Sequence, residues 1–230
     1  MRYAFFDVDN TVLNFKSMFK FQDFFYANTS MYNNEERLLE KEKFDKEFRE
    51  YFATNKPRLF INKRYYEYFK GRNKAEVEKL AEMWYNHEKQ NLSNSEFWIQ
   101  PVVNRLKSHQ EMGDKVVLIS GSCYEILLPL LRELNVADCI STQLEVIDGV
   151  YSGKIIGRQI IGDNKGESIK ELAEKNKINL KECFAFGDHI SDLSMHKIVG
   201  FPIVVEGDKE LEEIARENSW EIISNSNQNS

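Results

Sequence analysis

The stretch YAFFDVDNT at residues 3–11 decides the fold of this chain. It is a short apolar run that ends abruptly in carboxylates and a hydroxyl, which predicts a buried strand with acids at its C-terminal end. In open α/β sheets, ligands bind at that edge. Residues two apart on a strand point to the same side, so we expect Asp7 and Asp9 to converge. Two close carboxylates repel each other unless a cation lies beside them, and their oxygens favour Mg²⁺.

Length and composition bound the class of protein. The 230 residues, 42% of them hydrophobic, suffice for one large domain or one domain with an insertion. The net charge of -6, with Lys and Glu intermixed, argues against nucleic acid or an anionic membrane as the main partner. No segment reaches the roughly 18 apolar residues of a membrane span, and the start lacks a signal-peptide pattern. Three cysteines without metal-type spacing suit a reducing compartment, so we expect a cytoplasmic protein.

The first half of the chain predicts helices. From about residue 15 to residue 110, aromatic and aliphatic residues recur three and four apart among charged ones, as in residues 35–51, 61–69 and 74–89. Almost no strand pattern interrupts them. This stretch therefore reads as a helical insertion.

The rest of the chain predicts a parallel sheet. From Lys115 onward, short apolar runs alternate with amphipathic stretches, which is typical of strands covered by helices. Residues 144–151 predict a hairpin that turns at Asp148-Gly149, and the Asn/Ser-rich tail from Ser224 is expected to fray. The chain is expected to divide into a sheet core and a helical segment, namely residues 1–14 with 112–230 and residues 15–111.

Residues capable of phosphate chemistry follow the other apolar runs. One run leads into Ser120 and Gly121, a small-residue turn whose hydroxyl and backbone N–H groups can hold phosphate oxygens. A second pair of acids, Asp188 and Asp192, follows another run and implies a cation shared between strand ends. Between them, Lys165 opens a predicted helix, where its ammonium could neutralise both a carboxylate and a phosphate.

Taken in order, these residues resemble the four motifs of haloacid dehalogenase-superfamily phosphatases. The motifs are the DxDxT of Asp7, Asp9 and Thr11, then Ser120, then Lys165, then the GDxxxD of Gly187, Asp188 and Asp192. The match spans the whole chain, and its details after the second motif resemble the subclass IB hydrolases of bacteria. The helical insertion resembles the cap of the subfamily that contains phosphoserine phosphatase. The resemblance implies a Rossmann-like core with an inserted α-helical C1-type cap.

The resemblance also implies a mechanism. Asp7 would attack the phosphorus of a phosphomonoester and form an aspartyl-phosphate. Asp9 would protonate the leaving alkoxide and then deprotonate the hydrolytic water. Mg²⁺ would be held by Asp7, Asp188 and the backbone carbonyl of Asp9. Asp192 would not touch the metal but would orient a water molecule bound to it.

Further residues would bind the phosphate and select the substrate. The phosphoryl oxygens would be held by the side chains of Thr11, Ser120 and Lys165 and by the amide of Gly121. Phosphoserine phosphatases carry a glutamate for the substrate amine nine residues after the nucleophile, whereas this chain has Lys16, which speaks against phosphoserine. Arg64 lies near the position of the cap arginine that binds a carboxylate in those enzymes. For both residues the alternative is an ordinary surface role.

Three functions are open at this point. The first is a Mg²⁺-dependent phosphatase acting on a small phosphorylated metabolite. The second is a phosphotransferase or mutase, which would share every catalytic residue. The third, an aspartate-phosphorylated signalling module, fails because receiver domains carry their paired acids before the phosphorylated strand and lack a long helical insertion. The sequence leaves the substrate, the pathway and the oligomeric state open.

Overall fold

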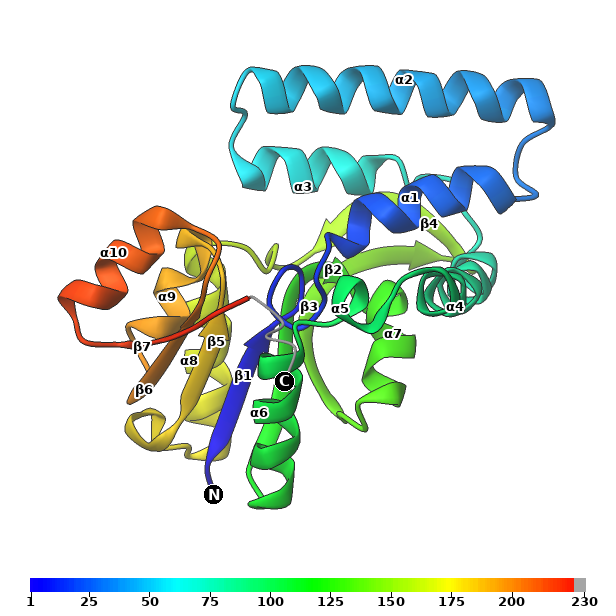
Figure 1. The fold of residues 1–230 in the computed structure, drawn as a ribbon. Helices are drawn as coiled ribbons and strands as arrows, with labels where there is room; N and C mark the ends of the chain where they lie inside the picture. Colours follow the sequence, from blue (N-terminus) through cyan, green and yellow to red (C-terminus); the bar gives the residue numbers. More distant parts are fainter. Residues whose placement is uncertain (226–230) are drawn as a thin grey trace.

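A seven-stranded sheet lies at the centre of the computed structural model, which describes residues 1–225 (Figure 1). Most of the tail expected to fray from Ser224 therefore lies outside the described residues. The strand order is β4-β3-β2-β1-β5-β6-β7, and every neighbouring pair is parallel except the β3–β4 hairpin. The strands are β1 (Tyr3–Asp7), β2 (Lys115–Cys123), β3 (Asp138–Ile147), β4 (Val150–Ile156), β5 (Phe184–Gly187), β6 (Phe201–Val205) and β7 (Glu221–Ile223).

Helices fill the long connection between β1 and β2 and alternate with the later strands. The connection contains α1 (Ser17–Asn28), α2 (Asn34–Ala53), α3 (Arg58–Glu67), α4 (Lys74–Asn91), α5 (Asn94–Phe97) and α6 (Gln100–Glu111). The later helices are α7 (Tyr124–Glu133), α8 (Asp163–Asn176), α9 (Leu193–His196) and α10 (Lys209–Glu217). None of the helices among residues 1–225 has the length and apolarity needed to cross a membrane.

Both faces of the sheet are buried, because alternate residues of each strand point to opposite sides. Phe6 and Leu118 belong to the larger core cluster, on the side covered by α6 and α7. Phe5 and Val117, one residue earlier on the same strands, belong to the second cluster, on the side of α8 and α9. The prediction of an α/β protein with a mainly parallel sheet is confirmed.

The α2–α3 pair stands away from the sheet, at the top of Figure 1. Asn33 begins α2 with a capping box, in which its side chain accepts from the backbone of Glu36 while the Glu36 carboxylate accepts from the backbone of Asn33. Aromatic rings then hold the pair together. The centre of the Phe44 ring lies 4.2 Å from the centre of the Phe48 ring and 6.1 Å from that of the Tyr65 ring. Phe44, Phe48 and Tyr65 belong to the same core cluster as Phe6 and Leu118, so the pair is joined through α1 to the core over the sheet.

Backbone hydrogen bonds join the helical segment to the β3–β4 hairpin. Gly71 N–H donates to the Tyr151 carbonyl, Tyr151 N–H donates to the Arg72 carbonyl, and Lys74 N–H donates to the Gly149 carbonyl, each at 2.9 Å. The chain between α3 and α4 thus runs antiparallel to β4 as a short additional bridge. The division at residues 14 and 111 stays a prediction, although α6, which ends at residue 111, already packs on β1 and β2.

Two strand segments were not predicted from the sequence. The first half of β3, which pairs in parallel with β2 from Asp138 onward, has only two apolar residues, Cys139 and Ile140, and shows neither an apolar run nor an alternation. Strand β7 has only three residues, too few for a periodic pattern. The turn at Asp148-Gly149, with positive φ at both residues, confirms the predicted hairpin.

Candidate active site

Seven residues predicted from the sequence line one pocket at the C-terminal edge of the parallel strands. Asp7 ends β1 and Asp188 directly follows β5, and the pairing of Phe6 with both Leu118 and Phe186 sets the ends of β1, β2 and β5 side by side. The seven residues are Asp7, Asp9, Ser120, Gly121, Lys165, Asp188 and Asp192. The pocket is narrow, with a cavity of about 50 Å³.

Lys165 holds two carboxylates together at the base of the pocket. Its Nζ lies 2.5 Å from Asp7 Oδ1 and 2.6 Å from Asp192 Oδ1, and all three side chains are buried. Burial raises the pKa of Asp7 well above its usual value, and repulsion from Asp192 and Asp188 adds to this, although Lys165 opposes it. Burial also acts on Asp192, but the charge and hydrogen bond of Lys165 outweigh it and lower the pKa of that carboxyl.

Asp188 completes an acidic cluster with Asp7 and Asp192. One carboxylate oxygen from each lies within 4.8 Å of the others. Thr11 Oγ1 donates to Asp188 Oδ1 at 3.0 Å, which orients that carboxylate. Burial, with repulsion from Asp192, raises the pKa of Asp188 to about 6. Three oxygen donors whose mutual repulsion a cation would relieve fit Mg²⁺, which prefers such hard ligands.

Asp9 is set apart from this cluster. Its Oδ1 accepts a hydrogen bond from Ser17 N–H at 3.0 Å, at the start of α1. Burial raises its pKa, while the contacts with Ser17 lower it, and the net direction is upward. The Asp9 carboxyl therefore favours its protonated form more than an exposed aspartic acid does, as a general acid requires. Its carboxylate is not part of the acidic cluster, so the expected metal contact through its backbone stays a prediction.

The phosphate-binding turn at Ser120 and Gly121 is a bulge in β2. Pairing with β3 passes from Ser120–Ser141 directly to Cys123–Thr142, so two residues of β2 have no partner in the ladder. Ser120 Oγ accepts from Ser122 N–H at 3.1 Å. A Cβ at Gly121 would lie 2.8 Å from the Cγ1 of Ile161, so a larger residue here would have to displace the Ile161 side chain.

The structure does not bring Arg64 into the pocket, contrary to the sequence prediction. Its guanidinium is held within the α2–α3 pair: Nε binds Glu47, Nη2 lies 3.1 Å from Glu47 Oε2, and Nη1 lies 2.6 Å from Glu67 Oε2. Two ion pairs thus occupy the side chain. Lys16 is exposed at the start of α1 and is not among the residues that line the pocket.

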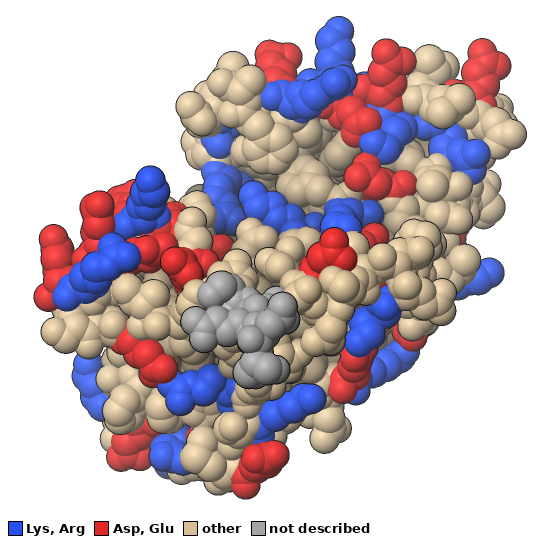
Figure 2. All heavy atoms as spheres, in the orientation of Figure 1, with Lys and Arg blue, Asp and Glu red and all other residues tan. Residues whose placement is uncertain are grey.

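Arg58 lines the pocket instead, and sequence reasoning missed it. It is the first residue of α3, directly after Pro57, and its Nη1 donates to Ser191 Oγ at 2.9 Å, so it bridges the helical segment and the loop after β5. Figure 2 shows Lys and Arg side chains gathered in the hollow beneath the α2–α3 pair. The only local signal was Pro57, which is typical of a helix start and predicts where α3 begins but not where Arg58 points.

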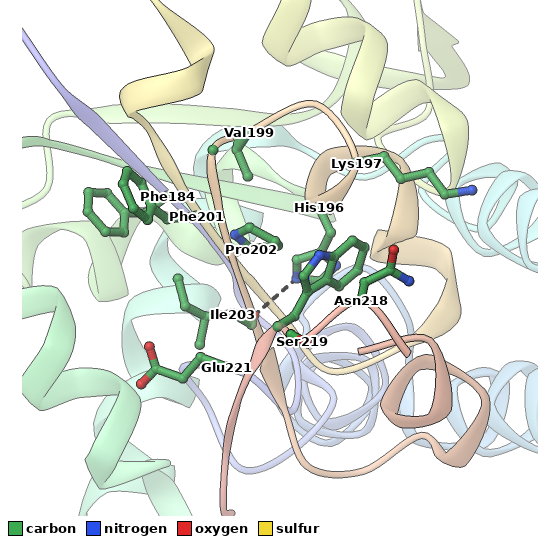
Figure 3. Close-up of a pocket in the computed structure, with 12 residues that line it drawn as sticks. Phe184, His196, Lys197, Val199, Phe201, Pro202, Ile203, Asn218, Ser219 and Glu221 are labelled. Atoms are coloured by element: carbon green, nitrogen blue, oxygen red, sulfur yellow. Dashed lines mark hydrogen bonds between the residues drawn. The ribbon is translucent and has the colours of Figure 1, made fainter. Parts of the chain in front are cut away.

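A larger hollow on the opposite edge of the sheet lacks this chemistry (Figure 3). It has a volume of about 440 Å³ and lies at the starts of β5, β6 and β7, where Phe184, Phe201 and Glu221 line it. His196 also lines it, and its Nε2 lies 3.1 Å from the Ile203 carbonyl. Without a cluster of acids at a strand end, this hollow is not suited to phosphoryl transfer.

A parallel sheet with an acidic, lysine-bearing pocket at its C-terminal edge is the arrangement of an α/β protein that binds its ligand at the strand ends. The chain matches the haloacid dehalogenase-like hydrolases over residues 4–197, and it belongs to that family. The resemblance drawn from the motifs is thus confirmed, and the relatives that the chain matches include proteins named as phosphatases.

Several similar proteins and solved structures cover most of the chain. Phosphoserine phosphatase SerB1 of Mycobacterium tuberculosis is 28% identical over 234 residues, which cover 95% of this chain and 69% of that protein. A protein of unknown function from Bordetella pertussis Tohama I has the same fold, with a TM-score of 0.81, 20% identity and coverage of 98% and 100%. A phospho-aspartyl intermediate analogue of phosphoserine phosphatase aligns with a TM-score of 0.64, 19% identity and coverage of 98% and 93%.

Proposed function

We propose that the protein hydrolyses a small phosphomonoester through an aspartyl-phosphate at Asp7, with Mg²⁺ as cofactor. One observation carries the proposal: the Asp7 carboxylate is buried and bonded to Lys165, beside two further acids and next to the bulge at Gly121. An anionic nucleophile and an anionic phosphoryl group repel each other, and Lys165 lies where it reduces that repulsion.

The reaction has two halves. In the first, an Asp7 oxygen forms a bond to phosphorus, the bond from phosphorus to the leaving oxygen breaks, and Asp9 gives its proton to that oxygen. In the second, water attacks the phosphorus of the aspartyl-phosphate, Asp9 takes a proton from that water, and inorganic phosphate leaves with Asp7 restored. The raised pKa of Asp9 suits its start as an acid.

Asp7, Asp188 and Asp192 are the side chains that would hold or orient Mg²⁺. When bound, the cation would offset negative charge on the phosphoryl group. Lys165, Thr11, Ser120 and the Gly121 amide are assigned to the phosphoryl oxygens.

The pocket supports a small substrate rather than a phosphorylated macromolecule, because its cavity is about 50 Å³ and Arg58 spans its rim. Arg58 is the cation available to the non-reacting end of the substrate, and this favours an anionic or neutral group there over an ammonium. A small phosphorylated metabolite in the cytoplasm is part of the same proposal.

The test is Asp7→Asn, which keeps the shape of the side chain and removes the nucleophilic anion. We expect phosphate release from p-nitrophenyl phosphate to fall below detection, while the melting temperature of the variant stays near that of the wild type. Beryllium fluoride with Mg²⁺ should protect the wild type alone against thermal unfolding. Substantial hydrolysis by Asp7→Asn would contradict the mechanism. Product analysis in the presence of alcohols separates transfer to water from transfer to another hydroxyl.

A further inference from the structure

The bulge that exposes the phosphate-binding turn also leaves a backbone carbonyl without a strand partner. Between Ser120 and Cys123 the ladder to β3 is interrupted, so the Gly121 carbonyl receives no hydrogen bond from β3. A buried carbonyl that remains unpaired destabilises the fold. A donor must therefore come from outside the sheet.

Helix α3 supplies two donors to this one carbonyl. Asn62 Nδ2 donates to the Gly121 oxygen at 3.0 Å, and Tyr66 Oη donates to it at 2.9 Å. Asn62 and Tyr66 lie one turn apart on α3, and they are 3% and 0% exposed, respectively. Both lone pairs of the carbonyl are thus occupied by side chains that belong to the helical segment.

The orientation of these donors is itself fixed. Asn62 Oδ1 accepts from Gln159 Nε2 at 3.1 Å, which orients the amide with its NH₂ group toward Gly121. Burial raises the pKa of the Tyr66 phenol well above its usual value. The phenol therefore stays a donor at every pH at which the protein would be assayed.

The flexibility of glycine is the reason that the Gly121 backbone needs these hydrogen bonds. A Cβ at position 121 would lie 2.8 Å from the Cγ1 of Ile161 and would displace that side chain, and glycine restricts its own backbone less than any other residue. The peptide before Gly121 is held by the pairing of Ser120 with Ser141. The peptide after it is held by Ser120 Oγ on the Ser122 N–H and by the two α3 donors on the Gly121 carbonyl. With both flanking peptides fixed, the direction of the Gly121 N–H is fixed as well.

We propose that Asn62 and Tyr66 are positioning residues: by holding the peptide between Gly121 and Ser122 they restrain the Gly121 backbone, and this keeps the Gly121 N–H, on the preceding peptide, aimed at the phosphoryl group before substrate arrives. This inference rests on the proposed function, because it assigns the Gly121 amide to a phosphoryl oxygen. It gives the helical segment a part in catalysis besides closing the pocket: docking of α3 completes the phosphate-binding turn. Preorganised donors of this kind act mainly on the transition state.

The experiment compares Tyr66→Phe with Tyr65→Phe. Tyr65 is the neighbouring residue, equally buried at 0% exposure, and its hydroxyl donates at 2.7 Å to another backbone carbonyl, that of Met18 in α1. Each variant loses one buried hydroxyl bonded to a carbonyl, so both should lose similar stability. Only the Tyr66 partner belongs to the phosphate-binding turn.

Binding of orthovanadate and of inorganic phosphate to the Mg²⁺-loaded protein is the main readout, since neither needs turnover. Orthovanadate resembles the five-coordinate transition state, and phosphate resembles the product. We expect Tyr66→Phe to weaken orthovanadate binding about tenfold and phosphate binding less than about threefold, with kcat reduced and KM little changed. Tyr65→Phe should leave both affinities unchanged.

The double variant Asn62→Leu with Tyr66→Phe provides a second test. Each single variant keeps one of the two donors and holds the carbonyl only in part, so the double variant should lose more orthovanadate affinity than either single variant and approach the roughly 10²-fold loss of a complete oxyanion donor. Equal orthovanadate affinity in Tyr66→Phe, Tyr65→Phe and wild type would overturn the inference. The proposed function would be overturned if the wild type hydrolysed no phosphomonoester. If the expected differences in orthovanadate affinity between the wild type and the variants were still found, the positioning role would remain supported.

Discussion

Among residues 1–225 two cationic side chains, Lys165 and Arg72, are buried, and their surroundings differ. Lys165 is 4% exposed and bonds two carboxylates at the base of the pocket. Arg72 is 0% exposed, yet its Nη1 donates to a neutral partner, the amide oxygen of Gln22, at 3.0 Å. Its guanidinium lies 3.7 Å from the centre of the Phe25 ring and 4.4 Å from that of Phe69.

The difference between these cations is in their partners, not in their burial. Lys165 is bonded to the carboxylates of Asp7 and Asp192, and an anionic phosphoryl group could take the place of one of these partners. Arg72 is stabilised by ring faces, which offer no exchangeable ligand, and burial lowers its pKa. A buried charge therefore indicates a functional site only where it shares its surroundings with other charges that change during the reaction.

The largest expected effect comes from Lys165→Met, which removes the ammonium and keeps most of the volume. We expect kcat/KM for p-nitrophenyl phosphate to fall about 10²–10³-fold, because the phosphoryl charge then faces the acids without compensation. Steady-state kinetics at saturating Mg²⁺ measure this. Arg72→Met is the matched control and should retain kcat/KM within about threefold. Similar activity in the two variants would remove the distinction between the cations.

Replacing Arg72 should change the free energy of unfolding. The size of the new side chain should decide whether the protein becomes less stable or not. Arg72→Ala leaves a cavity between the rings and should lower the free energy of unfolding by about 3 kcal/mol. Arg72→Met fills the space without a charge to desolvate and should be neutral or stabilising. Urea unfolding curves of both variants measure the difference. Equal losses for Met and Ala would show that the charge of Arg72 itself holds the fold.

The acidic cluster around Lys165 should make stability depend on pH and Mg²⁺ together. The pKa of Asp188 is raised from 3.8 to about 6 in the fold, so its contribution is fully present below pH 3.8 and is lost as pH rises through 6. Without metal this costs about 3 kcal/mol by pH 7.5. Mg²⁺ should therefore raise the melting temperature more at pH 7.5 than at pH 5. Asp188→Asn should abolish most of that difference, and a Mg²⁺ shift independent of pH would contradict the assignment.

The smallest expected effect comes from a third cation, the exposed Lys16. If it attracts anionic substrates at the mouth of the pocket, Lys16→Glu should lower kcat/KM for phosphoglycerate relative to phosphoserine by about tenfold or less, since solvent screens an exposed charge. Raising the salt concentration should shrink the change. An unchanged ratio of the two substrates would leave Arg58 as the selecting cation.

The sequence predicted the base of the site well because its geometry is set by the backbone. Asp7 and Asp188 come at the ends of strands, and parallel strands end at a common edge wherever they lie in the chain. Arg58 and Arg64 could not be separated in this way, because both occupy the same helix and differ only in what lies near each side chain. Glu47 takes up Arg64, whereas the start of α3 carries Arg58 to Ser191. That choice depends on how two distant segments pack, which no local pattern encodes.

The helical segment is fastened to the sheet core at both ends of α3. After α3, three main-chain hydrogen bonds join residues 71–74 to the β3–β4 hairpin. At the start of α3, Arg58 bonds Ser191 and the Leu59 carbonyl accepts from Gln159, so this end is held by side-chain bonds rather than by backbone pairing. Lifting this end from the pocket would break fewer and weaker bonds than detaching the helical segment from the hairpin.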